Sequence, residues 1–235
     1  MKRGRKMEKE FIEVGEYRVR VMPSLFEIGF YAVARGLVDV VNHLYFRVEI
    51  FGRDKIPAPP FILAPTHRSN LDTLLMGSLS RKRLRFMGKD SLWKNRFAGN
   101  MLSALGGFPV KREIADRAAV DSCVKVLRAG QALVLFPEGM RKDGSSVAEI
   151  LDGAAYIAIK AGVPVIPIGI SGSDRAMAKG VKVPRPKRVG RRVGDPIFNV
   201  ALEGDGRISR SKIKELTLIL QADLQEVFNQ AQLKL

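Results

Sequence analysis

Short apolar runs recur between residues 45 and 194 and alternate with segments that carry apolar residues at helical spacing. Such runs are typical of strands buried on both faces of a parallel sheet, and the segments between them suit crossover helices. The sequence therefore predicts an α/β fold with a largely parallel central sheet and helices on both faces. The predicted strands are 45–52, 60–66, 83–88, 106–112, 132–137, 163–170 and 188–194, and the predicted helices lie near 70–80, 91–105, 114–129, 153–162 and 209–233.

The segment 24–46 precedes the first predicted strand and is apolar except for a few positions. Arg35 and Asp39 interrupt it, so it offers no stretch of the roughly 18–20 uncharged residues that a membrane span needs. Wound at about 100° per residue, it separates into two sides. This pattern suits a helix lying in a bilayer interface, and it equally suits a helix packed on a sheet. The polar side holds Glu27, Arg35, Asp39, Asn42 and His43, and the apolar side holds Phe26, Phe30, Val33, Leu37, Val40, Val41 and Leu44.

The charge balance favours the interfacial helix. The chain carries 40 Lys and Arg against 24 Asp and Glu, a formal net charge of +16. Such an excess predicts polyanionic partners, among them nucleic acid, anionic lipid and phosphorylated small molecules. The cations cluster in the runs 1–10, 81–96 and 179–192, which together favour an anionic membrane surface. We therefore expect a basic arm and a membrane-interface helix in residues 1–48, and an α/β domain in residues 49–235.

Rare residue types limit the chemistry. Cys123 is the single cysteine, so no intrachain disulfide can form, and its apolar neighbours at helical spacing indicate a buried structural thiol. Two histidines and one cysteine cannot supply a zinc site of the common type, so we expect no metal. This cysteine usage suits a reducing, cytoplasmic compartment. We accordingly expect peripheral or monotopic attachment at the cytoplasmic face of the cell membrane.

Polar residues follow four of the predicted strands, at the edge where open α/β sheets bind ligands. A histidine there is neutral near pH 7 and can take a proton from an alcohol. Asp72, five positions after His67, fits the first turn of the next helix, where it can orient the imidazole. The cations predict a phosphorylated acceptor, and the absence of an obvious nucleophile favours direct transfer to a bound hydroxyl. The residues are His67 after 60–66, Lys89 after 83–88, Arg112 at the end of 106–112, and Glu138, Gly139 and Arg141 after 132–137.

Each of these residues also has a purely structural interpretation. His67 can be a loop histidine, and Asp72 can serve only as a charge at the start of a helix. Glu138 can pair with Arg141, and Arg112 can be a solvated cation at a strand end. The glycines near these residues can be required by turns alone.

Four blocks resemble those of the 1-acylglycerol-3-phosphate acyltransferase family, in the family's order, over about residues 45–200. "THRSNLD" resembles its H-x4-D block, "GGFPVKR" its glycine-and-arginine block, "FPEGMR" its F-P-E-G-[ST]-R block, and "VPVIPIGI" its fourth, proline-bearing block. The resemblance implies an α/β fold with an N-terminal interfacial helical motif. The implied roles are the base for His67, its orienting partner for Asp72, binding of the acceptor phosphate for Arg112, further phosphate contacts for Arg141 and Lys89, and shaping of the acceptor pocket for Glu138 and Gly139.

The resemblance implies that this protein is a membrane-associated enzyme. Such an enzyme moves a fatty acyl group from acyl-CoA or acyl carrier protein to 1-acyl-glycerol-3-phosphate, a lysophospholipid, and forms phosphatidic acid. The resemblance implies no cofactor besides this co-substrate. Met140 stands where the family has Ser or Thr, and Lys111 adds a cation beside Arg112, so the same chemistry on a glycolipid or another membrane alcohol stays open. The third alternative is a non-catalytic protein that binds nucleic acid or an anionic surface. No recognised nucleic-acid motif supports it, and we expect no specific nucleic acid partner.

Overall fold

A seven-stranded sheet lies at the centre of the computed structural model, which describes residues 11–14, 17–110, 117–198 and 208–233. The strand order is β3-β9-β8-β4-β7-β5-β6, and every neighbouring pair is parallel except β8 and β9. Each strand overlaps a segment predicted as one, and the α/β fold with a largely parallel sheet is confirmed. The strands are β3 (Glu49–Phe51), β4 (Ile62–Pro65), β5 (Leu84–Lys89), β6 (Gly107–Val110), β7 (Ala132–Val134), β8 (Val165–Ser171) and β9 (Gly190–Val193).

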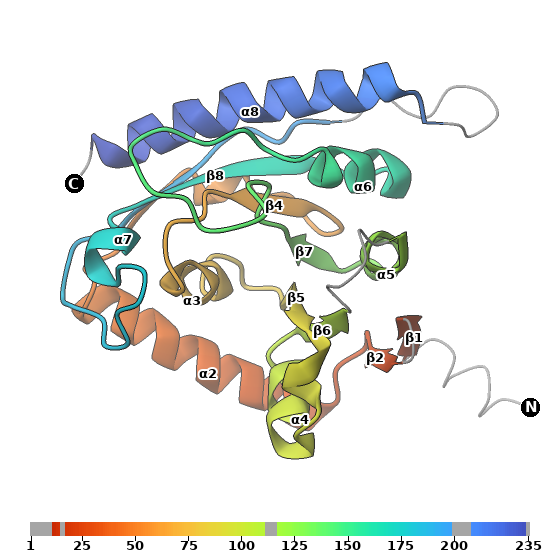
Figure 1. Ribbon diagram of the computed structural model, residues 1–235. Helices are drawn as coiled ribbons and strands as arrows, with labels where there is room; N and C mark the ends of the chain where they lie inside the picture. Colours follow the sequence, from red (N-terminus) through yellow and green to blue (C-terminus); the bar gives the residue numbers. More distant parts are fainter. Residues whose placement is uncertain (1–10, 15–16, 111–116, 199–207, 234–235) are drawn as a thin grey trace, which may run out of the picture.

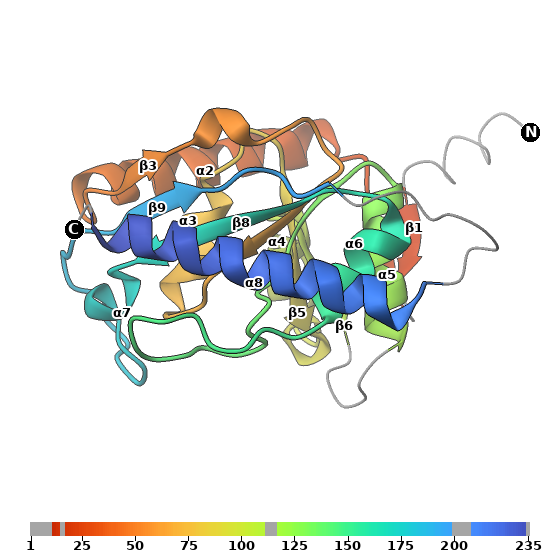
Figure 2. The same cartoon turned by 90° about the horizontal axis from the view of Figure 1, so that it is seen from above.

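Helices cover both faces of this sheet (Figures 1 and 2). Successive strand residues point to opposite faces, so the fully buried neighbours Ile62 and Leu63 belong to two different hydrophobic clusters. The first face is covered by α5 (Arg117–Arg128), α6 (Gly153–Ala161) and α8 (Arg210–Gln232), and the second by α2 (Leu25–Leu44) and α3 (Leu71–Gly77) with α4 (Arg96–Ala104) beside α2. The short helices are η1 (Arg53–Lys55), η2 (Asp90–Trp93) and α7 (Ser173–Ala176).

A two-stranded hairpin precedes these elements, with β1 (Phe11–Val14) antiparallel to β2 (Tyr17–Arg20). Val14 and Val19 are buried in the same hydrophobic cluster as residues of α5. These strands are absent from the predicted ones, because two four-residue runs interrupted by charged residues give too short an alternation to recognise. The hairpin ties this part of the chain to the sheet domain, whereas the predicted basic arm, residues 1–10, lies outside the described residues.

Helix α2 turns its polar side toward the protein. Asn42 is only 4% exposed, and its Nδ2 donates to Ser78 Oγ at 2.8 Å. The hydroxyl of Tyr31 donates to the carbonyl of Gly77, so the end of α3 supports the helix along this side. The apolar side is uncovered, with exposed fractions of 78% for Phe26, 73% for Val33, 65% for Leu37 and 72% for Leu44. The orientation is the reverse of that of a helix packed on a sheet by its apolar side.

Candidate active site

His67 lies in the loop between β4 and α3, at the carboxyl end of β4. Its backbone is held on both sides, because its amide donates to Glu138 Oε2 at 2.8 Å and its carbonyl accepts from the amide of Lys142 at 2.9 Å. The imidazole stacks on Phe136 with 4.0 Å between ring centroids. Its Nδ1 lies 2.9 Å from Asp72 Oδ2. These contacts set both the position and the orientation of the ring.

Asp72 is fully buried in the first turn of α3. Its Oδ2 also accepts from the amides of Arg68 at 2.6 Å and Ser69 at 2.7 Å. The loop after His67 therefore wraps around this carboxylate, which explains how a five-residue spacing brings the two side chains together. An ionised carboxylate can only accept hydrogen bonds, so Nδ1 of His67 carries the proton. Its Nε2 is then free to act as a base.

A buried ion pair supports this loop from behind. Arg68 Nη1 lies 2.9 Å from both carboxylate oxygens of Glu138, and the two side chains are 2% and 0% exposed. Arg68 also donates to the carbonyl of Ser146, and its guanidinium lies over the ring of Phe228. The partner of Glu138 is thus Arg68 rather than Arg141. Because the same carboxylate accepts from the amide of His67, Glu138 helps to hold the histidine loop in position.

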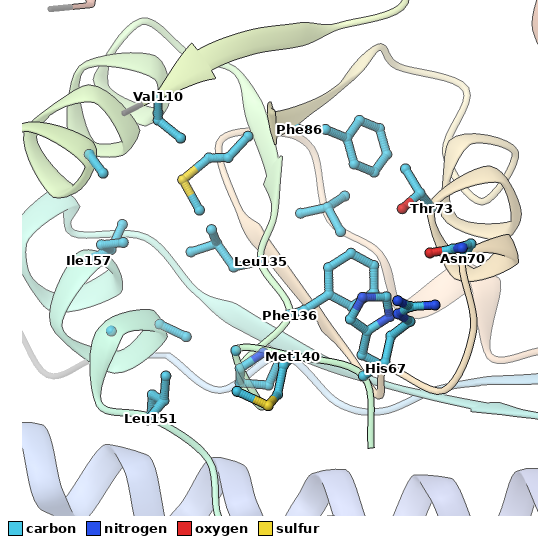
Figure 3. Close-up of a pocket in the computed structure, with 18 residues that line it drawn as sticks. His67, Asn70, Thr73, Phe86, Val110, Leu135, Phe136, Met140, Leu151 and Ile157 are labelled. Carbon is cyan, nitrogen blue, oxygen red and sulfur yellow. The ribbon is translucent and has the colours of Figure 1, made fainter. Parts of the chain in front are cut away.

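A cavity of about 850 Å³ opens beside the histidine ring. Figure 3 shows His67, Asn70 and Thr73 on one side of it, and Val110, Leu151 and Ile157 on the other. Most of the wall between them is apolar, so the cavity suits a hydrocarbon chain whose reactive end lies near the imidazole. The apolar lining consists mainly of Phe86, Met87, Val110, Ala119, Val134, Leu135, Phe136, Leu151, Ala154 and Ile157.

The other predicted site residues are divided between the cavity and its surroundings. Gly139 and Arg141 line the cavity. Gly139 has a φ of +72°, and a Cβ there would lie 2.7 Å from Leu151 Cδ1, so the turn itself favours glycine. Lys89, the exposed last residue of β5, is outside the cavity lining. Arg112 lies outside the described residues.

The single cysteine is buried close to the cavity wall. The Sγ atom of Cys123 lies 3.3 Å from the sulfur of Met87, which lines the cavity. Burial raises the pKa of Cys123 to about 12, so the thiol stays protonated at neutral pH. A protonated, buried thiol is a poor nucleophile. This agrees with the expectation of direct transfer without a covalent intermediate on this residue.

Sequence reasoning missed two functional contacts. Arg68 is not among the predicted site residues, and the available signal was a cation a few positions after a buried strand. Phe136 was included in a predicted strand with no contact to the site. Both depend on segments about 70 residues apart coming together, since Glu138 and Phe136 belong to the segment after β7. No local pattern reports such a contact.

The family model described as Acyltransferase matches residues 47–171, which include the loop of His67 and the segment of Glu138. The chain belongs to this acyltransferase family.

Individual relatives agree with this assignment. The chain is 30% identical over 153 residues to the chloroplastic 1-acyl-sn-glycerol-3-phosphate acyltransferase LPAT1 of Arabidopsis thaliana, covering 63% of this chain and 42% of that protein. It is 26% identical over 144 residues to the 1-acyl-sn-glycerol-3-phosphate acyltransferase of Bacillus subtilis, covering 60% of this chain and 71% of that protein. The match thus spans less than half of the chloroplast relative. The crystal structure of the 1-acyl-sn-glycerophosphate acyltransferase PlsC from Thermotoga maritima shares the fold, with a TM-score of 0.72 at 22% identity over 86% of this chain and 79% of that chain.

Proposed function

We propose that this protein transfers a fatty acyl group from a thioester, acyl-CoA or acyl carrier protein, to the free hydroxyl of 1-acyl-glycerol-3-phosphate. The observation that carries the proposal is the His67–Asp72 pair, 2.9 Å apart, beside an apolar cavity. The printed names of the relatives support this choice of acceptor. The product is phosphatidic acid.

The residues of the pair suit each proton transfer in this reaction. His67 Nε2 takes the proton of the acceptor hydroxyl, and the oxygen attacks the carbonyl carbon of the thioester. The carbon–sulfur bond of the tetrahedral intermediate then breaks, and the imidazolium returns the proton to the leaving thiolate. Asp72 keeps Nδ1 as the donor and stabilises the imidazolium that forms between these steps. The proton balance closes without a metal or a cofactor.

The cavity and the cations predicted at the site have complementary roles in substrate binding. The apolar wall takes the acyl chain of the donor, so that the thioester lies near His67. Arg141 at the cavity, together with Lys89 and Arg112, binds the acceptor phosphate. Glu138 keeps the histidine loop in place through its bonds to Arg68 and to the amide of His67.

The acceptor is a lipid, and the outer side of α2 suits attachment to the membrane that holds it. Its apolar side is exposed while its polar side contacts the protein, with Asn42 bonded to Ser78, as expected of a helix lying in a bilayer interface. Within the described ranges, no helix combines the length and apolarity that crossing a membrane requires. The proposed arrangement is peripheral or monotopic attachment, and the positive net charge favours the anionic cytoplasmic face.

A second acceptor class is favoured by one observation. Met140 is 64% exposed and lines the cavity, where the family's block has a hydroxyl side chain. Methionine removes a hydroxyl donor from this edge, which suits an acceptor without a phosphate there, such as a glycolipid or another membrane alcohol. The chemistry at His67 is the same for both classes.

The test is release of free thiol from palmitoyl-CoA, and from palmitoyl carrier protein, in detergent micelles with and without 1-acyl-glycerol-3-phosphate. We expect release that requires the acceptor and falls about 10²–10⁴-fold in His67→Ala, since a general base typically contributes this factor. Asp72→Asn should also show a large loss of acceptor-dependent thiol release, although the cavity is preserved. The matched control is His43→Ala, which removes the other histidine, exposed near the end of α2, and should retain activity.

The alternatives give different results. Release without an acceptor indicates a thioesterase. Release only with a glycolipid or another membrane alcohol keeps the chemistry and replaces the acceptor. No release with any acceptor and either donor contradicts acyl transfer and favours a protein that only binds anionic surfaces.

A further inference from the structure

The segment between α7 and β9 is the most uniformly basic exposed part of the described chain. No acidic residue occurs between positions 175 and 194. We call residues 178–188 the basic loop. Its five cations are all exposed, and Val183, an apolar residue that lies between two of them in the sequence, is 74% exposed. The cations are Lys179, Lys182, Arg185, Lys187 and Arg188.

The basic loop has a defined backbone. The amide of Arg185 donates to the carbonyl of Ala176 at 2.7 Å, and the amide of Lys187 donates to the carbonyl of Arg185 at 2.8 Å. The prolines at 184 and 186 further restrict the chain between these bonds, because their rings fix φ. The cations therefore project from a backbone of restricted conformation, which lowers the conformational entropy lost when they bind a common partner.

The basic loop is joined to the end of α2. The hydroxyl of Tyr45, directly after α2, donates to the carbonyl of Pro184 at 2.9 Å. Leu44, the last residue of α2, is 72% exposed. The outward apolar side of α2 thus ends beside a cluster of cations, on the opposite side of the sheet from α8 (Figure 1).

We propose that the basic loop binds the phosphate groups of an anionic phospholipid bilayer while the apolar side of α2 inserts beside it. The inference rests on the proposed function, and it identifies the part of the surface that selects the membrane. A bilayer offers an apolar phase next to a layer of anionic phosphates, which matches exposed Leu44 and Val183 beside the cations of the basic loop. A nucleic acid offers phosphates without an apolar phase beside them.

The arrangement has a consequence for attachment during turnover. The acceptor and the product of the proposed reaction carry the same phosphate group. The reaction therefore leaves an anionic lipid for the basic loop to bind, and attachment persists as product forms. Attachment should weaken with rising salt, since the interaction is electrostatic.

The test measures binding of the full chain to phosphatidylcholine vesicles with and without phosphatidic acid. The variant K182Q/R185Q should bind anionic vesicles about 30-fold more weakly than the wild type, at roughly fivefold per cation near an anionic surface. Its binding to pure phosphatidylcholine vesicles should be unchanged. The matched control is R210Q/K214Q, which removes two exposed cations from α8 on the other side of the sheet, and should retain the wild-type preference.

The proposal is overturned by equal losses in the two variants, because only net charge would then matter. It is also overturned if the wild type binds both kinds of vesicle equally, or if an oligonucleotide binds as tightly through the same two cations. Failure of the proposed function gives a different result, namely no thiol release by the wild type in detergent micelles, where no vesicle is present.

Discussion

Helices α2 and α8 are both long and amphipathic, but they face the sheet in opposite ways. Helix α8 buries its apolar side, including Leu220 and Leu224 at 0% exposed, against β8 and β9. The backbones of α8 and β8 approach so closely that a Cβ on Gly169 would clash with the carbonyl oxygen of Val227. Helix α2 instead exposes its apolar side and binds the protein through polar contacts such as that of Asn42.

The difference shows what an amphipathic pattern does and does not determine. Periodicity divides a helix into two sides, but it does not say which side the rest of the protein covers. For α8, small residues on the sheet make room for the apolar side. For α2, the partner surface at the end of α3 offers polar groups, among them Ser78 and the carbonyl of Gly77, so the polar side is satisfied there. The apolar side of α2 is thus left for another apolar phase.

The largest effect is expected from placing charges on the outer side of α2. In F26D/L37D, two exposed apolar side chains are lost from the proposed bilayer contact. Each contributes about 1.5–3 kcal/mol when buried, so vesicle binding should weaken by about 10²–10⁴-fold. Vesicle co-sedimentation measures the change, and the free energy of unfolding should shift little because both positions are exposed.

The control is L218D/I219D on α8, where both residues are also exposed, at 58% and 43%. It should leave vesicle binding unchanged. Equal losses in the two variants, or none in the α2 variant, would show that the outer side of α2 has no special contact with membranes.

The second largest effect concerns stability and uses one leucine from each helix. Leu220→Ala removes a fully buried side chain from α8 and should lower the free energy of unfolding by about 2–5 kcal/mol. Leu37→Ala removes a side chain that is 65% exposed and should change it by no more than about 0.5 kcal/mol. Urea denaturation in the absence of lipid measures both. A comparable loss for Leu37→Ala would mean that this side of α2 is covered in solution, and its dependence on protein concentration would then reveal self-association.

The fold could be predicted where burial leaves a continuous trace in the sequence. Strands β4 and β8 are covered on both faces, so their residues form uninterrupted apolar runs. The hairpin of β1 and β2 could not be found, because only Val14 and Val19 of its eight residues are buried. The pattern of α2 is the same whichever side faces inward, so only the charge balance of the chain favoured the orientation with the apolar side outward.

The candidate site divides in a similar way. His67 and Asp72 were predictable because they are close in sequence and follow a strand whose end is recognisable. The pairing of Arg68 with Glu138 joins residues 70 positions apart, and nothing local distinguishes it from pairing with Arg141. The catalytic roles themselves stay predictions until thiol release is measured.

The smallest effect is a pH dependence confined to the start of α2. Burial raises the pKa of Glu27, but hydrogen bonds from Ser24 and Arg20 outweigh burial and together hold this pKa below its ordinary value. The carboxylate therefore stabilises the folded state above the unfolded pKa of about 4.3, and this stabilisation is lost as the pH falls through the lower folded pKa. We expect a loss of no more than about 1 kcal/mol, as for other capping groups.

The measurement is the difference in the free energy of unfolding between wild type and E27Q, followed from about pH 6 to about pH 3. Glutamine can keep the capping bonds but does not titrate, so the wild type should lose stability relative to E27Q as the pH falls. Helix α8 is the internal comparison, because its first turn carries no acidic residue. Amide protection, taken relative to the intrinsic exchange rate at each pH, should accordingly fall at low pH in the first turn of α2 and not in that of α8. Parallel stability profiles for the wild type and E27Q would contradict a role for Glu27. The contrast follows from the way the two helices begin, since the first turn of α2 is capped by a carboxylate that titrates, whereas that of α8 carries no acidic residue.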